Sequence, residues 1–182
     1  GELLALVAES AFPARRSAGG IVGLPDSGRY FVGRETELEA LSALLLGPDD
    51  ARVGVVHGMA GAGKTALAVT AARQVAGSFP DGCLFFDLRG HTPGAVELSA
   101  GEALHRLLRL LDVPADQLPA DEDGLANLVR DQLRGRRMIL VLDNVRSAEQ
   151  VRAIVDGETS SRILVTSRGR LPALDDAWHL PV

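Results

Sequence analysis

A glycine-rich segment at residues 58–65 carries the residue types best suited to chemistry. It has the spacing G-x-x-x-x-G-K-T, follows an apolar run at 53–56 and opens a stretch with helical patterning. Glycines let backbone N–H groups turn toward an anion, and a helix N-terminus adds a positive potential. In such a loop Lys64 neutralises β- and γ-phosphates, and the Thr65 hydroxyl holds Mg²⁺. A glycine-rich turn without a ligand is the alternative, which the flanking strand and helix patterns disfavour.

The composition supports the same interpretation of Lys64. It is the only lysine of the chain, whereas arginine occurs throughout. A guanidinium does not replace a compact ammonium where a point charge must reach between phosphates. The single lysine is therefore predicted to be a phosphate ligand.

Two further apolar runs end in residues that suit a phosphate site. Residues 137–145 carry Asp143 near their end, about 80 residues after the glycine-rich loop, as expected of the carboxylate that orients Mg²⁺ opposite Thr65. Residues 162–168 end with Arg168, which suits a sensor of the γ-phosphate; a surface ion pair is the alternative.

A fourth apolar run, at residues 83–88, has four residues at its carboxyl end whose role stays open. They are Asp87, Arg89, Gly90 and His91. Ligands bind at the carboxyl edge of an open α/β sheet, so these residues are candidates for a site. A strand-end turn with a local Asp/Arg pair is the alternative.

The elements that must position these residues alternate along the chain. Apolar runs at 53–57, 83–88, 137–145, 162–168 and 177–182 predict strands. Periodic leucines and caps predict helices at 36–46, 65–76, 99–111, 123–133 and 147–154. Alternation of this kind predicts an α/β fold in which a parallel sheet has helices on both faces.

Composition and charge exclude several classes of protein. A net charge of −5 and scattered arginines, densest at 134, 136 and 137, argue against direct nucleic-acid contact. One cysteine, Cys83, excludes an internal disulfide, and four isolated histidines argue against a histidine metal site. No stretch is apolar enough to span a bilayer, and residues 1–8 lack the basic start of a signal peptide. A cytoplasmic location without membrane contact is expected.

Together the motifs resemble the NB-ARC nucleotide-binding domain of STAND-type signalling ATPases, and most closely that of bacterial, actinobacterial regulators. Residues 30–35 match the family's entry motif, 58–65 its P-loop, 140–145 its Walker B segment and 164–168 its sensor. The four motifs occur in the family's order and cover about residues 29–182. The combination is more specific than any one motif alone.

The resemblance implies a P-loop NTPase fold and a set of site residues. The fold is a parallel five-stranded sheet in the order 5-1-4-3-2. Arg34 closes an adenine pocket that the backbone of Phe31 and Val32 contacts, and Arg168 reads the third phosphate. The remaining nucleotide-binding residues are Gly58, Gly61, Ala62, Gly63, Lys64, Thr65 and Ala66. Thr65 and Asp143 hold Mg²⁺, and Lys64, Asp143 and Arg168 form the catalytic set.

The resemblance also implies a switch driven by ATP and ADP. A closed ADP form alternates with an open ATP form that can form homo-oligomers and communicates with other domains of a longer protein. Asn144 stands where many relatives have a second acidic residue, so hydrolysis is expected to be slow. Residues 1–28 are expected to be a linker or the remnant of a preceding segment, and 29–182 the nucleotide-binding domain without its lid and winged-helix subdomains.

Two other functions fit the same motifs. A P-loop kinase or fast ATPase would have an acceptor site around residues 87–101 and turn over at roughly 1–10³ s⁻¹. A scaffold that binds nucleotide only for stability would have equal affinity for ADP and ATP.

Overall fold

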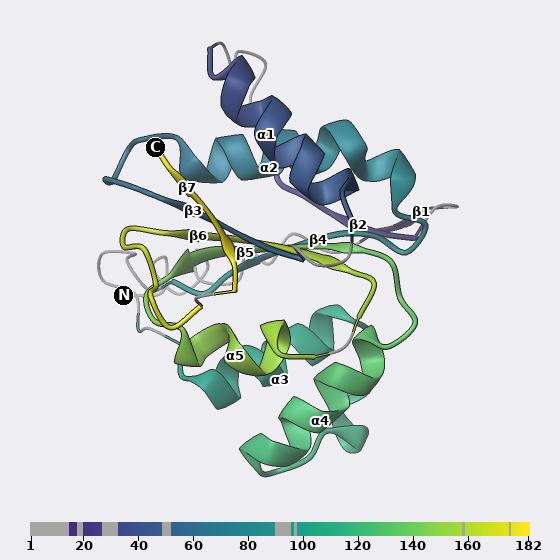
Figure 1. The fold of residues 1–182 in the computed structure, drawn as a ribbon. Helices are drawn as coiled ribbons and strands as arrows, with labels where there is room; N and C mark the ends of the chain where they lie inside the picture. The colour runs from purple at the N-terminus through teal and green to yellow at the C-terminus, as the bar shows by residue number, and fades with distance from the viewer. Residues whose placement is uncertain are drawn as a thin grey trace, which may run out of the picture.

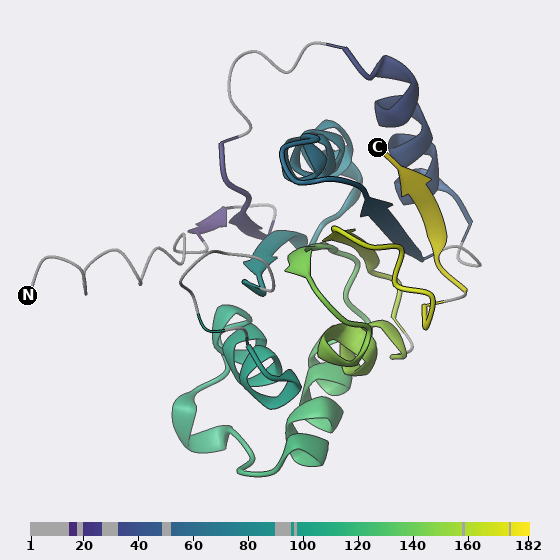
Figure 2. The same ribbon diagram turned by 90° about the vertical axis from the view of Figure 1, so that its left-hand side faces the viewer.

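A central sheet with helices on both faces forms the structure, a computed structural model that describes residues 15–17, 20–26, 33–48, 52–89, 96, 98–157, 159–174 and 176–182. Helices α1 (Glu35–Leu46) and α2 (Lys64–Val75) cover one face. The other face carries α3 (Ala100–Leu110), α4 (Glu122–Leu133) and α5 (Glu149–Val155). Figure 2 shows the two helical layers on opposite sides of the strands. Each helix lies within two residues of its predicted bounds.

The sheet contains the predicted five parallel strands in the predicted order. These are β3 (Val53–His57), β4 (Gly82–Asp87), β5 (Ile139–Val145), β6 (Arg162–Ser167) and β7 (Trp178–Pro181). They run β4-β5-β6-β3-β7 across the sheet. When these five strands are numbered 1 to 5 in chain order and read from the β7 edge, this is the predicted order 5-1-4-3-2. The strand before the glycine-rich loop therefore lies between β6 and β7, and the strand that ends near Asp143 lies next to β6.

Two short strands from the segment expected to be a linker extend this sheet at the β4 edge. β1 (Arg15–Ser17) pairs antiparallel with β2 (Gly20–Gly23), and β2 runs parallel to β4. An unpaired edge strand presents free backbone donors and acceptors, which a neighbouring segment satisfies by pairing with it. The described sheet thus has seven strands.

The sheet separates two hydrophobic cores, and β5 contributes to both. Leu140 and Leu142 pack in the cluster beneath α3, α4 and α5, whereas Ile139 and Val141 pack in the cluster beneath α1 and α2. All four side chains are fully buried. Burying a side chain of this size contributes about 1.5–3 kcal/mol each, so β5 anchors the sheet that holds the site.

Two helices on the α3 side, α3 and α4, have side-chain caps at their N-termini. The predicted capping box of α3 is present: the Ser99 hydroxyl accepts from the Glu102 N–H, and the Glu102 carboxylate accepts from the Ser99 N–H at 2.8 Å. Asp121 caps α4 by accepting from the Gly124 N–H at 2.9 Å. A cap of this kind stabilises a helix by about 1 kcal/mol.

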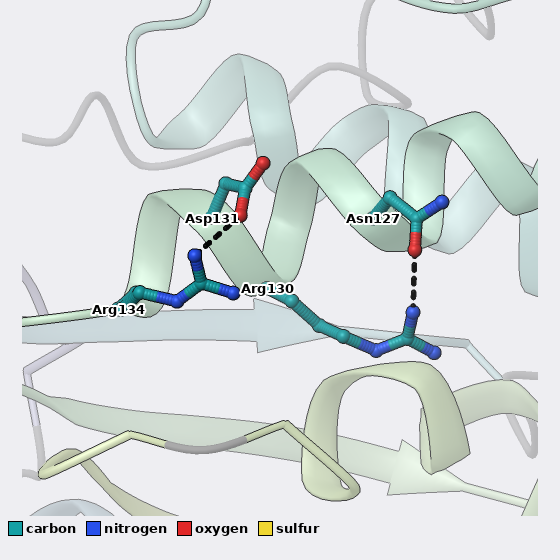
Figure 3. A network of polar contacts seen from close by, with 4 residues as sticks. All are labelled: Asn127, Arg130, Asp131 and Arg134. Atoms are coloured by element: carbon teal, nitrogen blue, oxygen red, sulfur yellow. Dashed lines mark hydrogen bonds and ion pairs between the residues drawn. The ribbon is translucent and has the colours of Figure 1, made fainter.

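The arginines at the C-terminal end of α4 engage their own neighbours. Arg130 donates to the Asn127 side chain at 2.8 Å, and Arg134 forms an ion pair with Asp131 at 3.3 Å (Figure 3). Arg136 donates to Gln132 at 3.1 Å. Such contacts near the surface, three and four residues apart, stabilise a helix by a few tenths of a kcal/mol.

Candidate phosphate-binding site

The glycine-rich loop connects β3 to α2 and depends on glycine backbone conformations. Gly58, Gly61 and Gly63 have φ values of 156°, 79° and 83°. A Cβ on Gly61 or Gly63 would meet no atom of the described residues within 4 Å, so their positive φ rather than crowding favours glycine there. At Gly58 space also matters, because a Cβ would lie 2.0 Å from the Val182 carbonyl oxygen.

The N-terminus of α2 presents backbone donors that no side chain caps. Its N-cap residue is Gly63 in the left-handed conformation, which has no side chain to accept from the first turn. The first N–H groups of the helix, those of Lys64, Thr65 and Ala66, have no partner inside the helix itself. These donors and the helix dipole suit an anion such as a phosphate group.

Lys64 lies across the loop that precedes it. Its Nζ donates to the carbonyl oxygens of Gly58 at 2.9 Å and Met59 at 2.7 Å. Burial lowers the pKa of Lys64, and the positive charge of Arg168 lowers it further, while the negative charge of Asp143 opposes both. Both a carboxylate and a second cation therefore act on the ammonium, and an added anion would be attracted to both cations.

Asp143 and two threonines connect the loop to the sheet. The Thr65 hydroxyl donates to Asp143 Oδ1 at 2.7 Å, and the Thr166 hydroxyl donates to the same oxygen. The Asp143 side chain is 4% exposed. Burial raises the pKa of Asp143, and the hydrogen bonds from Thr166 and Thr65 offset part of that rise.

The side-chain oxygens of Thr65 and Asp143 are suitable ligands for Mg²⁺. Thr65 and Asp143 offer a hydroxyl and a carboxylate oxygen side by side, which are hard ligands of the kind Mg²⁺ prefers. Within the described residues no cluster of three or more His, Cys, Asp or Glu could hold a metal ion. Mg²⁺ in nucleotide sites takes only one or two protein ligands and completes its shell with phosphates and water.

The end of β6 places Arg168 near the loop. Ser167 accepts from the Gly58 N–H through its carbonyl oxygen at 3.3 Å, which ties β6 to the start of the loop. Arg168 follows Ser167 directly, and the positive charge of its exposed side chain lowers the pKa of Lys64. Its role as a reader of the third phosphate stays a prediction.

The entry motif is described only in part. Phe31 and Val32 lie outside the described residues, as do Gly90 and His91. Arg34 precedes α1 with a positive φ of 67° and forms an ion pair with Glu37 at 3.6 Å. The predicted contact of Phe31 and Val32 with adenine stays a prediction, because both residues lie outside the described part of the chain.

Sequence reasoning missed the contribution of Thr166. Its hydroxyl also accepts from the Asn144 N–H at 3.1 Å, so it connects the side chain of Asp143 with the backbone of Asn144, both in β5. The residue is 1% exposed and stands in a strand that is otherwise apolar at positions 163–165. A polar residue at the end of an apolar run could have indicated a buried hydrogen bond. Its partner could not be predicted from the sequence, because the partner depends on β5 being the neighbouring strand.

Comparison with known proteins gives the family. Residues 34–171 match the NB-ARC domain. The chain is 37% identical to the regulatory protein AfsR of Streptomyces griseus over 86% of its length, and 36% identical to AfsR of Streptomyces coelicolor over 98%. It is 32% identical to the disease resistance protein RGA4 of Oryza sativa subsp. japonica over 74%. The chain spans 16%, 18% and 13% of these relatives' own lengths.

Solved structures share the fold at low sequence identity. The Aeropyrum pernix ORC1 protein, solved in complex with DNA, matches with a TM-score of 0.56 at 18% identity, over 84% of this chain and 43% of that one. The Aeropyrum pernix ORC2 protein, solved as ADPNP-ADP complexes, matches with a TM-score of 0.55 at 16% identity, over 87% and 50%. At this identity the likeness concerns the fold alone.

These matches agree with the site geometry, in which a glycine-rich loop, an uncapped helix N-terminus and a strand-end aspartate meet. Among the described helices, none has the length and apolar character needed to cross a membrane. The chain belongs to the NB-ARC family of nucleotide-binding domains with a P-loop NTPase fold.

Proposed function

We propose that this chain is the ATP- and ADP-binding switch domain of a multidomain regulator and that it hydrolyses Mg-ATP slowly. The observation that carries the proposal is the contact of the Thr65 hydroxyl with Asp143, at 2.7 Å, directly after Lys64 and the uncapped start of α2. The proposal is supported by the closeness of a cation, a helix N-terminus and two oxygen atoms of the kind that Mg²⁺ prefers. The match to AfsR supports a role in regulation.

The chain's own residues divide the work of binding between them. The N–H groups at the start of α2 and the Lys64 ammonium would hold the phosphates, with Lys64 exchanging the Gly58 and Met59 carbonyls for phosphate oxygens. Thr65 and Asp143 would hold the metal ion. When bound, Mg²⁺ neutralises charge that develops on the phosphate oxygens during transfer.

Discrimination between ATP and ADP is assigned to Arg168. A ligand shifts a conformational equilibrium only by its difference in affinity for the two states, so a switch needs a group that contacts the γ-phosphate. Arg168 follows the end of β6 and has an exposed side chain. Its positive charge is close enough to lower the pKa of Lys64. Other domains of the longer protein would detect the resulting change.

The experiment that tests the proposal is to denature the purified protein and identify the released nucleotide, followed by titration with ADP and Mg-ATP. Stoichiometric ADP, unequal affinities for the two nucleotides and turnover below about 1 s⁻¹ are expected. Equal affinities would refute the switch, and turnover well above that value would indicate a fast ATPase or kinase.

Two substitutions test the assigned residues. Lys64→Ala removes the ammonium between the phosphates and is expected to abolish tight binding of both nucleotides; retained affinity for Mg-ATP would contradict the site. Arg168→Ala is expected to weaken ATP while leaving ADP nearly unchanged. Arg170→Ala is the matched control, because it removes another exposed arginine two residues further along. An equal loss for ADP and ATP in Arg168→Ala would contradict the role of a sensor.

A further inference from the structure

A second carboxylate lies beside Asp143 at the carboxyl edge of the sheet. Asp87 ends β4 and stands directly opposite Asp143 in the parallel register with β5. Adjacent strands lie about 4.8 Å apart, so the two backbones are close neighbours. The negative charge of Asp87 is one of the influences that raise the pKa of Asp143.

Both carboxylates belong to the face of the sheet that carries the glycine-rich loop. Cys83 in β4, like Ile139 and Val141 in β5, packs in the core beneath α1 and α2. Side chains alternate along a strand, so Asp87 and Asp143 project to that same face. The contact of Asp143 with Thr65, in the first turn of α2, agrees with this direction. Asp87 therefore borders the place assigned to the phosphates.

Two hydrogen bonds fix the orientation of the Asp87 carboxylate. Its Oδ1 accepts from the Arg89 N–H at 2.8 Å and from the Asn144 side-chain amide at 3.1 Å. The positive charge of Arg106, on α3, also interacts with Asp87. A carboxylate can accept about four hydrogen bonds, so the Asp87 carboxylate, which accepts these two, can also accept a hydrogen bond from water.

The backbone at Asn144 is shaped to direct its amide at Asp87. Asn144 has a positive φ of 57°, and the pairing of β5 with β6 shifts register between Leu142 and Val145. Its N–H donates to Thr166, which holds the residue in place. An amide cannot accept the proton of a water molecule, but it can orient a carboxylate that does.

We propose that Asp87 accepts the proton of the water that attacks the γ-phosphorus and that Asn144 is the positioning residue for its carboxylate. This inference rests on the proposed hydrolysis of ATP at the same site. It gives the chain a proton acceptor although position 144, where the family resemblance implies a second acidic residue in many relatives, is an asparagine here. Asp143 itself is nearly fully buried and accepts from the hydroxyls of Thr65 and Thr166.

The step balances with water as the only co-reactant. The water oxygen forms a bond to the γ-phosphorus while the bond to the β–γ bridging oxygen breaks, and that oxygen keeps the electron pair as ADP departs. One water proton passes to the Asp87 carboxylate, directly or through one bridging water, and is later released to solvent.

Asp87→Asn tests the assignment because the amide keeps an oxygen that can accept from the Arg89 N–H. Single-turnover hydrolysis is expected to fall by about 10²–10⁴-fold, the usual contribution of proton transfer. Affinities for ADP and Mg-ATP are expected to stay within about threefold of the unsubstituted chain. Protein incubated with Mg-ATP and then denatured should release ATP in place of ADP. Asp116→Asn, which removes the charge of an exposed aspartate elsewhere, should release ADP as before.

The double variant Asp87→Asn with Asn144→Asp exchanges the acid and the amide between the two strands. It is expected to regain at least about tenfold of the lost rate, because a carboxylate returns beside the same water with an amide partner. A purely structural role of Asp87 would predict no such recovery. Hydrolysis by Asp87→Asn at the unsubstituted rate, or loss of nucleotide affinity in parallel with the rate, would overturn the inference and leave the proposed function standing. Failure of the unsubstituted chain to bind nucleotide would overturn the proposed function itself.

Discussion

Two threonines with buried hydroxyls offer a matched test of how the site is held together. The Thr166 hydroxyl donates to Asp143 and accepts from the Asn144 N–H. The Thr70 hydroxyl, in α2, is buried and has no hydrogen-bond partner among the described residues. Thr→Val replaces the hydroxyl by a methyl group of similar size in both cases. The same chemical change should therefore have opposite consequences.

The magnitude for Thr166→Val follows from the groups left behind. The Asn144 N–H loses its partner, which costs about 1–3 kcal/mol, and the Asp143 carboxylate loses a donor worth about 1.5–3 kcal/mol. Because such terms do not add fully, we expect a loss of about 3 kcal/mol. At about 2–4 °C per kcal/mol for a domain of this size, Tm falls by about 6–12 °C.

Thr70→Val should leave Tm unchanged or raise it by up to about 4 °C, since it removes an unsatisfied buried hydroxyl worth about 1 kcal/mol. Valine and threonine have similar helix propensities, so the backbone contributes little to the difference. The assay is thermal unfolding followed by circular dichroism at one protein concentration. Equal shifts in Tm for the two variants would refute the reasoning, because the loss of stability would then not depend on whether the threonine hydroxyl is hydrogen-bonded.

Three further substitutions test separate features. Gly58→Ala should lower the free energy of unfolding in a urea titration by about 3 kcal/mol, since its Cβ would meet the Val182 carbonyl and its φ disfavours a side chain. The control Gly77→Ala should be neutral in the same titration, because no atom of the described residues lies within 4 Å of its Cβ. Asp143→Asn keeps an oxygen acceptor but removes a buried charge, so its Tm should be at least that of the unsubstituted chain while Mg²⁺-dependent binding of ATP is lost; a lower Tm would contradict the raised pKa of Asp143. Burial, His179 and Arg170 lower the pKa of His57, so the unfolded chain takes up the proton first and stability falls as the pH drops below about 6.5. His57→Gln should reduce that fall between about pH 7 and pH 5, and an unchanged slope would count against it.

Much of the fold followed from local properties of the sequence. The capping box of Ser99 and Glu102, the helical leucines and the apolar strands each depend on residues close in the chain, and all were predicted close to their observed bounds. The sheet order was implied by the resemblance rather than by the pattern of any strand. The pairing of β1 and β2 with the edge of the sheet was not predicted, because three- and four-residue strands give almost no periodic signal.

The sequence by itself determined the phosphate-binding loop, since its glycine positions, its single lysine and the helix that follows are contiguous and act through backbone conformation. It also placed Asp143 and Arg168 at strand ends. Only the tertiary structure decided which polar groups meet there: Thr166 with Asp143, and Asp87 with Asn144. These contacts join positions 23 and 57 residues apart. They exist because β5 lies between β4 and β6, and that neighbourhood is set by the packing of the whole sheet rather than by any one segment.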